Sequence, residues 1–159
     1  YIFKSRSPSC GLNDTPIVID SRETCGPGLY TRQIIAAIPL LPVTDEVSLK
    51  VEKSGINFLE RACAFNRWQQ FLERPVSADR LRMFHVLHTP ELERHHADKA
   101  KELSDSLGSI EDPVPVWAAQ VYLERFMSAL QTPVIMNMLA GELFEKHTLL
   151  SAALANHAD

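Results

Sequence analysis

Residues 54–75, SGINFLERACAFNRWQQFLERP, decide the fold class because their apolar side chains recur at helical spacing. The side chains that fall close to one face of such a helix are Ile56, Leu59, Cys63, Phe65, Trp68 and Leu72. Ser54 is the expected N-cap, and Pro75 cannot continue a helix. The stretch therefore predicts an amphipathic helix whose apolar face packs against other elements.

Four further helices are expected after this one. Ser77 should cap the first of them, which carries apolar residues at Leu81, Phe84, Val86 and Leu87. Thr89-Pro90 should end that helix early and start a polar helix that reaches Leu107. The last two helices are expected to carry Trp117, Val121, Phe126 and Leu130, and then, after Thr132-Pro133, Ile135, Met138, Leu139, Leu143 and Phe144. Five helices with short connections predict a helical bundle.

The first 48 residues differ in character, because Gly, Pro and Ser are frequent there. Two β-strands are expected, Tyr1-Ile2-Phe3 and Ile17-Val18-Ile19. A helix should run from Gly28 to Ile38, and residues 39–42 and 44–54 should form a linker. The sequence thus predicts a mostly α protein in two parts: a partial α/β unit at residues 1–48 and a helical domain at residues 49–159.

Composition narrows the class of protein. The 159 residues have a formal net charge of -4, which gives no general attraction to nucleic acid or to an anionic membrane. The longest apolar run, Ile34 to Leu41, is broken by Pro39 and is too short to span a bilayer. Three widely spaced cysteines are a poor disulfide framework and are typical of a reducing compartment. We therefore expect a cytoplasmic location.

Residues 4–11, KSRSPSCG, are the candidate for chemistry in the first part. Gly11 allows a sharp turn that could expose backbone amides, and the serines offer hydroxyls to an anion or a substrate. Lys4 and Arg6 would lower the pKa of the Cys10 thiol if they lie close to it. The residues alone leave two interpretations open at about even odds: a reactive or ligating cysteine, or an ordinary turn with a bystander cysteine.

Residues 1–12, YIFKSRSPSCGL, resemble the signature segment of the DUF523 family, which includes thiouracil desulfurase. The similarity continues through residues 26–32 and 39–43. The resemblance implies a Rossmann-like α/β domain on which three cysteines hold a [4Fe-4S] cluster. It also implies that Cys10 is one cluster ligand, that Ser7 has a catalytic role, and that the substrate is a small thiolated, pyrimidine-like molecule.

The other two cluster ligands and a catalytic acidic residue of that family precede this motif. Cys25 and Cys63 do not stand at ligand positions, and the chain opens within a strand at Tyr1. We therefore expect an N-terminally truncated fragment that holds no cluster and has no desulfurase activity by itself. For Cys63 the helical pattern favours a buried, inert thiol.

Residues 57–68 resemble the start of DUF1722, a domain that often follows DUF523 in one polypeptide. Phe84-His85-Val86-Leu87-His88 is similar to the Phe-His-x-x-His element of that family, and residues 122–141 are similar to its closing helices. A lysine is expected after this element, whereas the chain has Thr89-Pro90. Any role of that lysine is therefore not carried over.

His85 and His88 share a helix face, and His95 and His96 follow within reach. Glu91 could complete a metal-binding set with them, but the spacing is not that of HExxH and a proline interrupts it. The pattern favours a solvated or capping histidine cluster over a metal site. The charged residues from Glu91 to Asp105 are interpreted as the solvated face of a helix.

Two functions follow as hypotheses. The first is part of a [4Fe-4S]-dependent desulfurase with a helical accessory domain. The alternative is a helical binding or interaction module with no catalysis of its own. Neither hypothesis involves nucleic acid or a membrane, and the sequence does not define an oligomeric state.

Overall fold

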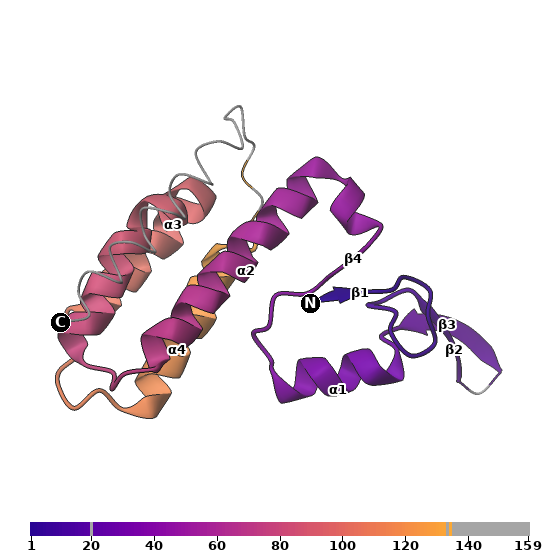
Figure 1. Cartoon of the computed structure of the whole chain (residues 1–159), viewed down its shortest axis with the longest axis horizontal. Coiled ribbons are helices and arrows are strands. Elements are labelled where there is room, and N and C mark those ends of the chain that lie inside the picture. The colour runs from indigo at the N-terminus through magenta and orange to yellow at the C-terminus, as the bar shows by residue number, and fades with distance from the viewer. Residues whose placement is uncertain (20, 133, 135–159) are drawn as a thin grey trace.

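The computed structural model describes residues 1–19, 21–132 and 134. Its N-terminal part holds four short strands and one helix, and its C-terminal part consists of long helices packed side by side (Figure 1). The prediction of a mostly α protein is confirmed. The fifth expected helix, with Ile135, Met138 and Phe144, lies outside the described residues.

The strands form two separate pairs. β1 (Ile2–Phe3) pairs in parallel with β4 (Thr44–Asp45), while β2 (Thr15–Ile19) and β3 (Arg22–Gly26) form an antiparallel hairpin. Both expected strands are present, but they do not pair with each other. Phe3 is buried, whereas Tyr1 and Ile2 are about half exposed. Each strand pair is small, so the sheets bury little surface by themselves.

Helix α1 (Leu29–Ala37) confirms the helix expected from Gly28, which is its N-cap residue. The expected linker is wrong in part, because residues 44–54 contain β4, a short 3-10 helix η1 (Ser48–Lys50) and the start of α2. The Asp45 carboxylate organises this segment by accepting hydrogen bonds from the amides of Val47 and Ser48. A side chain that bonds its own turn in this way replaces the expected flexible connection.

Helices α2 (Glu52–Leu72), α3 (Ala78–Leu107) and α4 (Val116–Ala129) form the C-terminal part. Ser54 is not the N-cap of α2, because the helix starts earlier and Val51 holds that position. Ser77 does cap α3, and its side chain accepts a hydrogen bond from the amide of Arg80 at 3.3 Å. The bundle therefore begins three residues earlier than the sequence predicts.

The break expected at Thr89-Pro90 is wrong, since α3 continues through Pro90. Pro90 removes the hydrogen bond to the carbonyl of Val86, and Val86 lies on the exposed side of the helix. The Thr89 hydroxyl also donates to the carbonyl of His85 at 2.9 Å. The helical backbone is interrupted instead at His96, where φ is -162° and ψ is 91°.

This interruption reverses the direction of the chain. A straight helix of 30 residues would be ~45 Å long, so its two ends could not meet. Yet Asp112, five residues after the end of α3, accepts a hydrogen bond from the amide of Ala78 at its start. Residues 78–95 and 97–107 are therefore two helical segments folded back on each other, and with α2 and α4 they make four packed helical segments.

The core of the bundle is aromatic. Trp68 of α2, Phe84 of α3 and Tyr122 of α4 contact one another, with the Trp68 and Tyr122 rings stacked at 5.6 Å between centroids. Several residues predicted to lie on apolar faces are exposed instead: Leu59, Leu72, Val86 and Trp117. The described part of the chain has no helix long and apolar enough to cross a membrane.

Candidate functional site

The loop of residues 4–11 leaves β1 and is held by its own backbone. The carbonyl of Ser7 accepts hydrogen bonds from the amide of Gly11 and the hydroxyl of Thr15, each at 2.8 Å. Arg6 has a φ of 55°, a conformation that is strained for a residue with a side chain. Its amide donates to the Asp14 carboxylate at 2.9 Å, which holds this conformation in place.

Gly28 allows the loop to lie against the start of α1. A Cβ at this position would stand 2.4 Å from the carbonyl carbon and oxygen of Ser9, which is backbone that cannot move aside cheaply. Because the approach is so close, the carbonyl of Ser9 accepts hydrogen bonds from the amides of Tyr30 at 2.9 Å and Thr31 at 3.3 Å. The free amides at the start of α1 are thus used by the loop itself.

Cys10 and Ser7, the two predicted site residues, lie within one turn. The amide of Cys10 donates to Ser7 Oγ at 3.3 Å, and Ser7 Oγ lies 3.3 Å from Ser9 Oγ. Ser9 Oγ lies in turn 3.3 Å from Cys10 Sγ. Two hydroxyls therefore connect in sequence to one thiol, and Cys10 and Ser7 are both half-buried. Ser9 was not singled out from the sequence, although it directly precedes the cysteine.

The expectation that Gly11 exposes amides to an anion is not met. The amides of Cys10 and Gly11 bond to the side chain and carbonyl of Ser7. What the loop offers to a small molecule is therefore a set of side-chain hydroxyls and a thiol.

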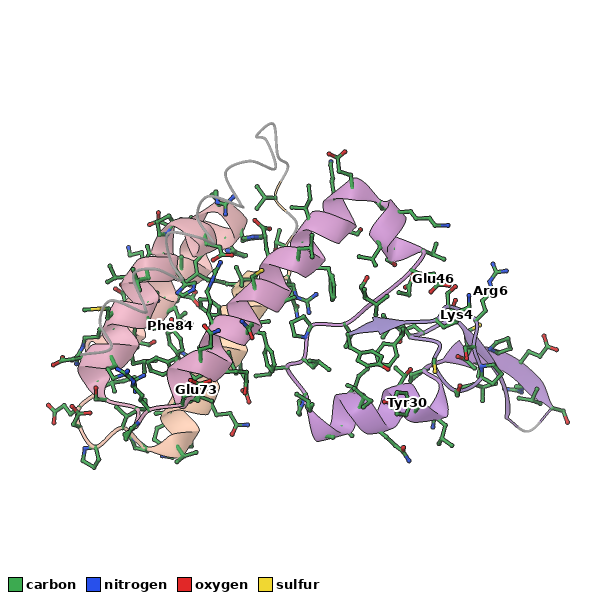
Figure 2. All side chains as sticks on the ribbon, viewed as in Figure 1. Lys4, Arg6, Tyr30, Glu46, Glu73 and Phe84 are labelled. Carbon is green, nitrogen blue, oxygen red and sulfur yellow. The ribbon has the colours of Figure 1, made fainter. Side chains whose placement is uncertain are left out.

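Glu46, which directly follows β4, is the carboxylate that Lys4 and Ser5 of the loop contact. Glu46 accepts hydrogen bonds from the amide of Ser5 at 2.8 Å and its hydroxyl at 2.9 Å, and Lys4 lies 3.8 Å away. These bonds, with the one from the Ser5 amide first, hold the pKa of Glu46 below its ordinary value. Figure 2 shows Lys4, Arg6 and Glu46 gathered at this end of the molecule. Lys4 therefore forms its ion pair with the carboxylate of Glu46 and not with Cys10.

Two tyrosines near the loop were also missed by the sequence reasoning. Tyr1 and Tyr30 have ring centroids 6.3 Å apart. The hydrogen bond to Tyr30 is the largest cause that raises the pKa of Tyr1, and the charge of Cys10 adds to it. The Cys10 thiol therefore lies within electrostatic reach of a phenol. The signal that could have found this pair is weak, because Tyr1 directly precedes β1 and Tyr30 lies within α1, and neither position marks a site.

The other two cysteines stand apart from this loop. Cys25 is exposed on β3, and Cys63 is half-buried on α2 rather than enclosed. All three cysteines are free thiols. Across residues 1–19, 21–132 and 134, no group of three or more His, Cys, Asp and Glu side chains is placed to hold a metal ion.

A second polar cluster occupies the interior of the helical part. Of the two expected roles for the histidines, solvated or capping, the solvated one is wrong for His85, His88 and His95, which are 3%, 1% and 6% exposed, whereas His95 does bond a carbonyl just after the end of α4. Helix periodicity brings them to the inner face of α3 together with the aromatic core. His96 is the exception, being half-buried at the reversal of the chain, where its Nδ1 accepts a long hydrogen bond from the amide of Lys99.

His88 is enclosed by aromatic rings. Its ring stacks on Phe84 with centroids 4.2 Å apart and meets the edge of Phe126 at 5.5 Å. Nδ1 lies 2.7 Å from the carbonyl of Phe84, so this nitrogen carries a proton and donates. Burial lowers the pKa of His88 to about 4, with the nearby charge of Arg67 acting in the same direction. The ring is neutral, and its Nε2 has no hydrogen-bond partner within the described residues.

His85 repeats this pattern one turn earlier. Its Nδ1 lies 3.3 Å from the hydroxyl of Tyr122, which is itself buried on α4. Burial lowers the pKa of His85 and raises that of Tyr122, so both side chains are uncharged near neutral pH. A neutral pair of this kind is compatible with an apolar interior, whereas a charged ring would not be.

The charged members of the cluster come from α2 and α3. Arg67 lies 3.3 Å from Glu91, and both side chains are largely buried. Burial raises the pKa of Glu91, and Arg67 opposes that shift. Glu91 was expected on the solvated face of its helix, so this expectation is wrong for Glu91. It holds for Glu93, Asp98 and Lys101, which are exposed.

Glu60 joins the cluster from α2 and is 2% exposed. One of its oxygens lies 3.1 Å from Nε2 of His95, and the other lies 3.4 Å from Arg94. The His95 contact is at ion-pair distance, although the ring nitrogen does not make a well-aligned hydrogen bond to the oxygen. Sequence reasoning missed Glu60, since acidic residues in the middle of a helix are usually solvated.

A surface groove of about 660 Å³ lies between the second segment of α3 and α4. Its lining is mixed in charge, with Lys99, Glu102 and Asp105 on one side and Glu124, Arg125 and Ser128 on the other. None of the residues predicted to carry chemistry lines this groove.

No protein-family model, no curated protein and no solved structure matches the chain.

Proposed function

We propose that the loop of residues 4–11 forms one side of a sulfur-handling site, in a protein of the DUF523 and DUF1722 type. The observation that carries the proposal is the connected series of Ser7 Oγ, Ser9 Oγ and Cys10 Sγ, with 3.3 Å between neighbours. In the intact protein the substrate would be a small thiolated molecule of the pyrimidine type. Water would supply the oxygen that replaces the sulfur on the carbon, and the sulfur would leave as sulfide.

Ser7 is suited to act on a substrate rather than to fix the fold. Its oxygen already accepts from the amide of Cys10, so its own proton is available to a hydroxyl or a substrate atom. A hydroxyl held in this way can position an attacking water or pass on a proton. Ser9 extends the series to the thiol and can donate to Cys10 Sγ.

The described residues do not fit a [4Fe-4S] cluster by themselves. Cys10 is the single thiol at the loop, while Cys25 lies on β3 and Cys63 on α2, outside the loop. A four-iron cluster of this kind is held by several cysteine thiolates. We therefore propose Cys10 as one ligand only; by the resemblance to DUF523, its companions would have to come from cysteines outside the described residues, and we derive no chemical step through the cluster.

The test begins with the chain as it stands. Iron and acid-labile sulfide are measured after anaerobic reconstitution, and no stoichiometric four-iron cluster is expected. In a longer polypeptide that supplies two further cysteines before Tyr1, a cluster is expected. Cys10→Ala should remove that cluster, and Cys25→Ala, the matched control, should retain it. A four-iron signal that survives Cys10→Ala would overturn the ligand assignment.

Ser7 is tested in the same longer polypeptide by sulfide release from a thiolated pyrimidine. Ser7→Ala should keep the cluster spectrum and lower turnover by about 10²-fold, if the hydroxyl takes part in proton transfer. Turnover near that of the unmodified protein would leave Ser7 as a turn-forming residue only.

The groove between α3 and α4 supports a second candidate function, a helical binding module with no catalysis of its own. Lys99, Glu102, Glu124 and Arg125 give it charges of both signs, which suits a zwitterionic or mixed-charge peptide more than a uniformly charged polymer. The test is binding of a mixed-charge peptide to the chain. Binding that Arg125→Glu abolishes and Cys10→Ala leaves unchanged would favour this candidate over the first.

A further inference from the structure

The C-terminal end of α4 is bonded by side chains from other helices. Carbonyl groups in the last turn of a helix lack partners within the helix and carry its negative dipole end. Three side chains from α2 and α3 donate to carbonyls at or just after this end: Lys99 to Ser128 in the last turn at 3.4 Å, Asn57 to the C-cap residue Leu130 at 2.8 Å, and His95 to Thr132, two residues beyond the C-cap, at 2.6 Å. Two of these donors are basic groups, so the end of α4 has a built electrostatic cap.

His95 differs from the other two donors because its opposite nitrogen faces a carboxylate. Nδ1 contacts the Thr132 carbonyl, which can only accept, so Nδ1 carries a proton. Nε2 lies 3.1 Å from Glu60, and the two side chains are 0% and 1% exposed. An ionised carboxylate carries no proton, so a proton on Nε2 turns this close approach into a contact between opposite charges, although the two atoms are not aligned as a hydrogen bond. The stable arrangement is an imidazolium between a carbonyl and a carboxylate.

The charges around His95 favour this arrangement. Burial alone would lower the pKa of His95, but the contact with Glu60, the Thr132 carbonyl and the charge of Glu91 together raise it above the ordinary value. The groups that face the ring are Glu60 from α2, Glu91 and Arg94 from α3, and, from the end of α4, only a backbone carbonyl within the described residues.

We propose that His95 is a proton-dependent latch, which holds the end of α4 against α2 and α3 while its ring is protonated and releases that end when the proton is lost. A neutral ring has one N–H and cannot serve both Thr132 and Glu60. A buried carboxylate that loses its partner is strongly unfavourable, and Arg94, which is more than a third exposed, compensates it only in part.

His95 lies where a change in its contacts also affects the junction between the two segments of α3. His95 directly precedes His96, where the two segments of α3 reverse direction. Lys99, on the second segment, contacts both the carbonyl and the hydroxyl of Ser128. Loss of the His95 contact therefore loosens the end of α4 at the same junction that sets the angle between the α3 segments. The latch goes beyond the proposed sulfur chemistry, because it lies wholly in the helical part.

The test is a measurement of the full chain between pH 6 and pH 9. Backbone amides near the end of α4, such as those of Leu130 and Gln131, are followed by hydrogen exchange corrected for the intrinsic rate, and the His95 ring is followed by NMR. The folded pKa is raised, so the contact is complete at low pH and is lost as the pH rises through that pKa. Protection of these amides should fall by up to tenfold for each pH unit above it.

Two variants separate the latch from a purely structural role. His95→Gln keeps a donor but cannot titrate, so protection at the end of α4 should no longer vary with pH. His88→Phe removes a neighbouring buried imidazole that does not touch α4 carbonyls, and it should keep the full pH response. Constant protection in the unmodified chain while the His95 ring titrates, or a ring that stays neutral throughout, would overturn the proposal. Loss of protection over all the helices at once would also overturn it, because the release would then be global.

Discussion

His88 makes a quantitative prediction about stability in acid. Its ring is 1% exposed, packed between Phe84 and Phe126, and its pKa is lowered from 6.5 to about 4. In the unfolded chain the ring returns to its ordinary pKa and binds a proton more readily. The unfolded state therefore gains protons first as the pH falls, and the free energy of unfolding decreases from pH 6.5 down to about 4.

The size of the effect follows from the two pKa values. Between pH 7 and pH 5 the single ring should cost about 2 kcal/mol of stability. His88→Phe keeps an aromatic ring in the same place and removes the titration, so its stability should vary less with pH by this amount. The carbonyl of Phe84 keeps the helical hydrogen bond from the backbone at position 88, so the substitution leaves no orphaned acceptor.

The assay is urea denaturation at several pH values from 7 to 5, read by circular dichroism. The quantity compared is the difference in unfolding free energy between the two pH limits, which removes any constant packing cost of the larger ring. His88→Gln serves as a second variant that cannot titrate, and His96→Gln as a control at a half-buried imidazole outside the aromatic enclosure. An unchanged pH dependence in both His88 variants would refute the burial argument.

Two further predictions concern the loop and the charged pair. Gly28→Ala should displace the loop, because its Cβ would stand 2.4 Å from the backbone of Ser9. The alkylation rate of Cys10, measured with Cys25 and Cys63 replaced by serine, should therefore change. Gly108→Ala, whose Cβ has ordinary space, is the control and should leave that rate unaltered. Glu91→Leu should destabilise the fold by about 3 kcal/mol in chemical denaturation, because Arg67 is then buried without its partner. The double change Arg67→Met with Glu91→Leu should recover most of that loss, and a double variant as unstable as the single one would contradict the pairing.

The sequence predicts well where apolar spacing and end signals agree. Trp68, Leu81 and Phe126 are core residues as expected, and Ser77 caps α3 as expected. The reversal at His96 could not be predicted, because Pro90 gives the stronger local signal for a break. Its effect is overridden by tertiary packing on the inner face and by the exposure of Val86 on the outer face.

The sequence predicted which residues of the loop lie together, but it predicted only some of their contacts. Cys10 and Ser7 lie together because they belong to one short turn in the seven residues, 4–10, that separate β1 from Gly11, which is local information. The partner of Lys4 is Glu46, which is more than forty residues away along the chain. Such a pairing depends on the parallel contact of β1 with β4, and no spacing rule in the sequence encodes it.

The burial of the histidines could not be predicted for a related reason. An imidazole is compatible with either face of a helix, and the choice depends on what the neighbouring helices supply. Here α2 supplies Glu60 and Arg67, which meet His95 and Glu91 across the interior. A rule that treats all charged residues as solvated therefore places the polar residues of the inner face of α3 in solvent.

These polar contacts set the register of α2 within the bundle. Glu60 contacts His95, Arg67 contacts Glu91, and Asn57 contacts the carbonyl of Leu130, so α2 is bonded across the interior at three positions between residues 57 and 67. A slip of α2 by one turn, ~5.4 Å, would break all three contacts and leave buried charges without partners. Apolar side chains would tolerate the same slip at much lower cost, because they contact any apolar neighbour. Buried charge pairs add little net stability over well-packed apolar residues, so what these contacts contribute is a single alignment of the helices. That alignment is what brings His95 to the end of α4, and the latch depends on it.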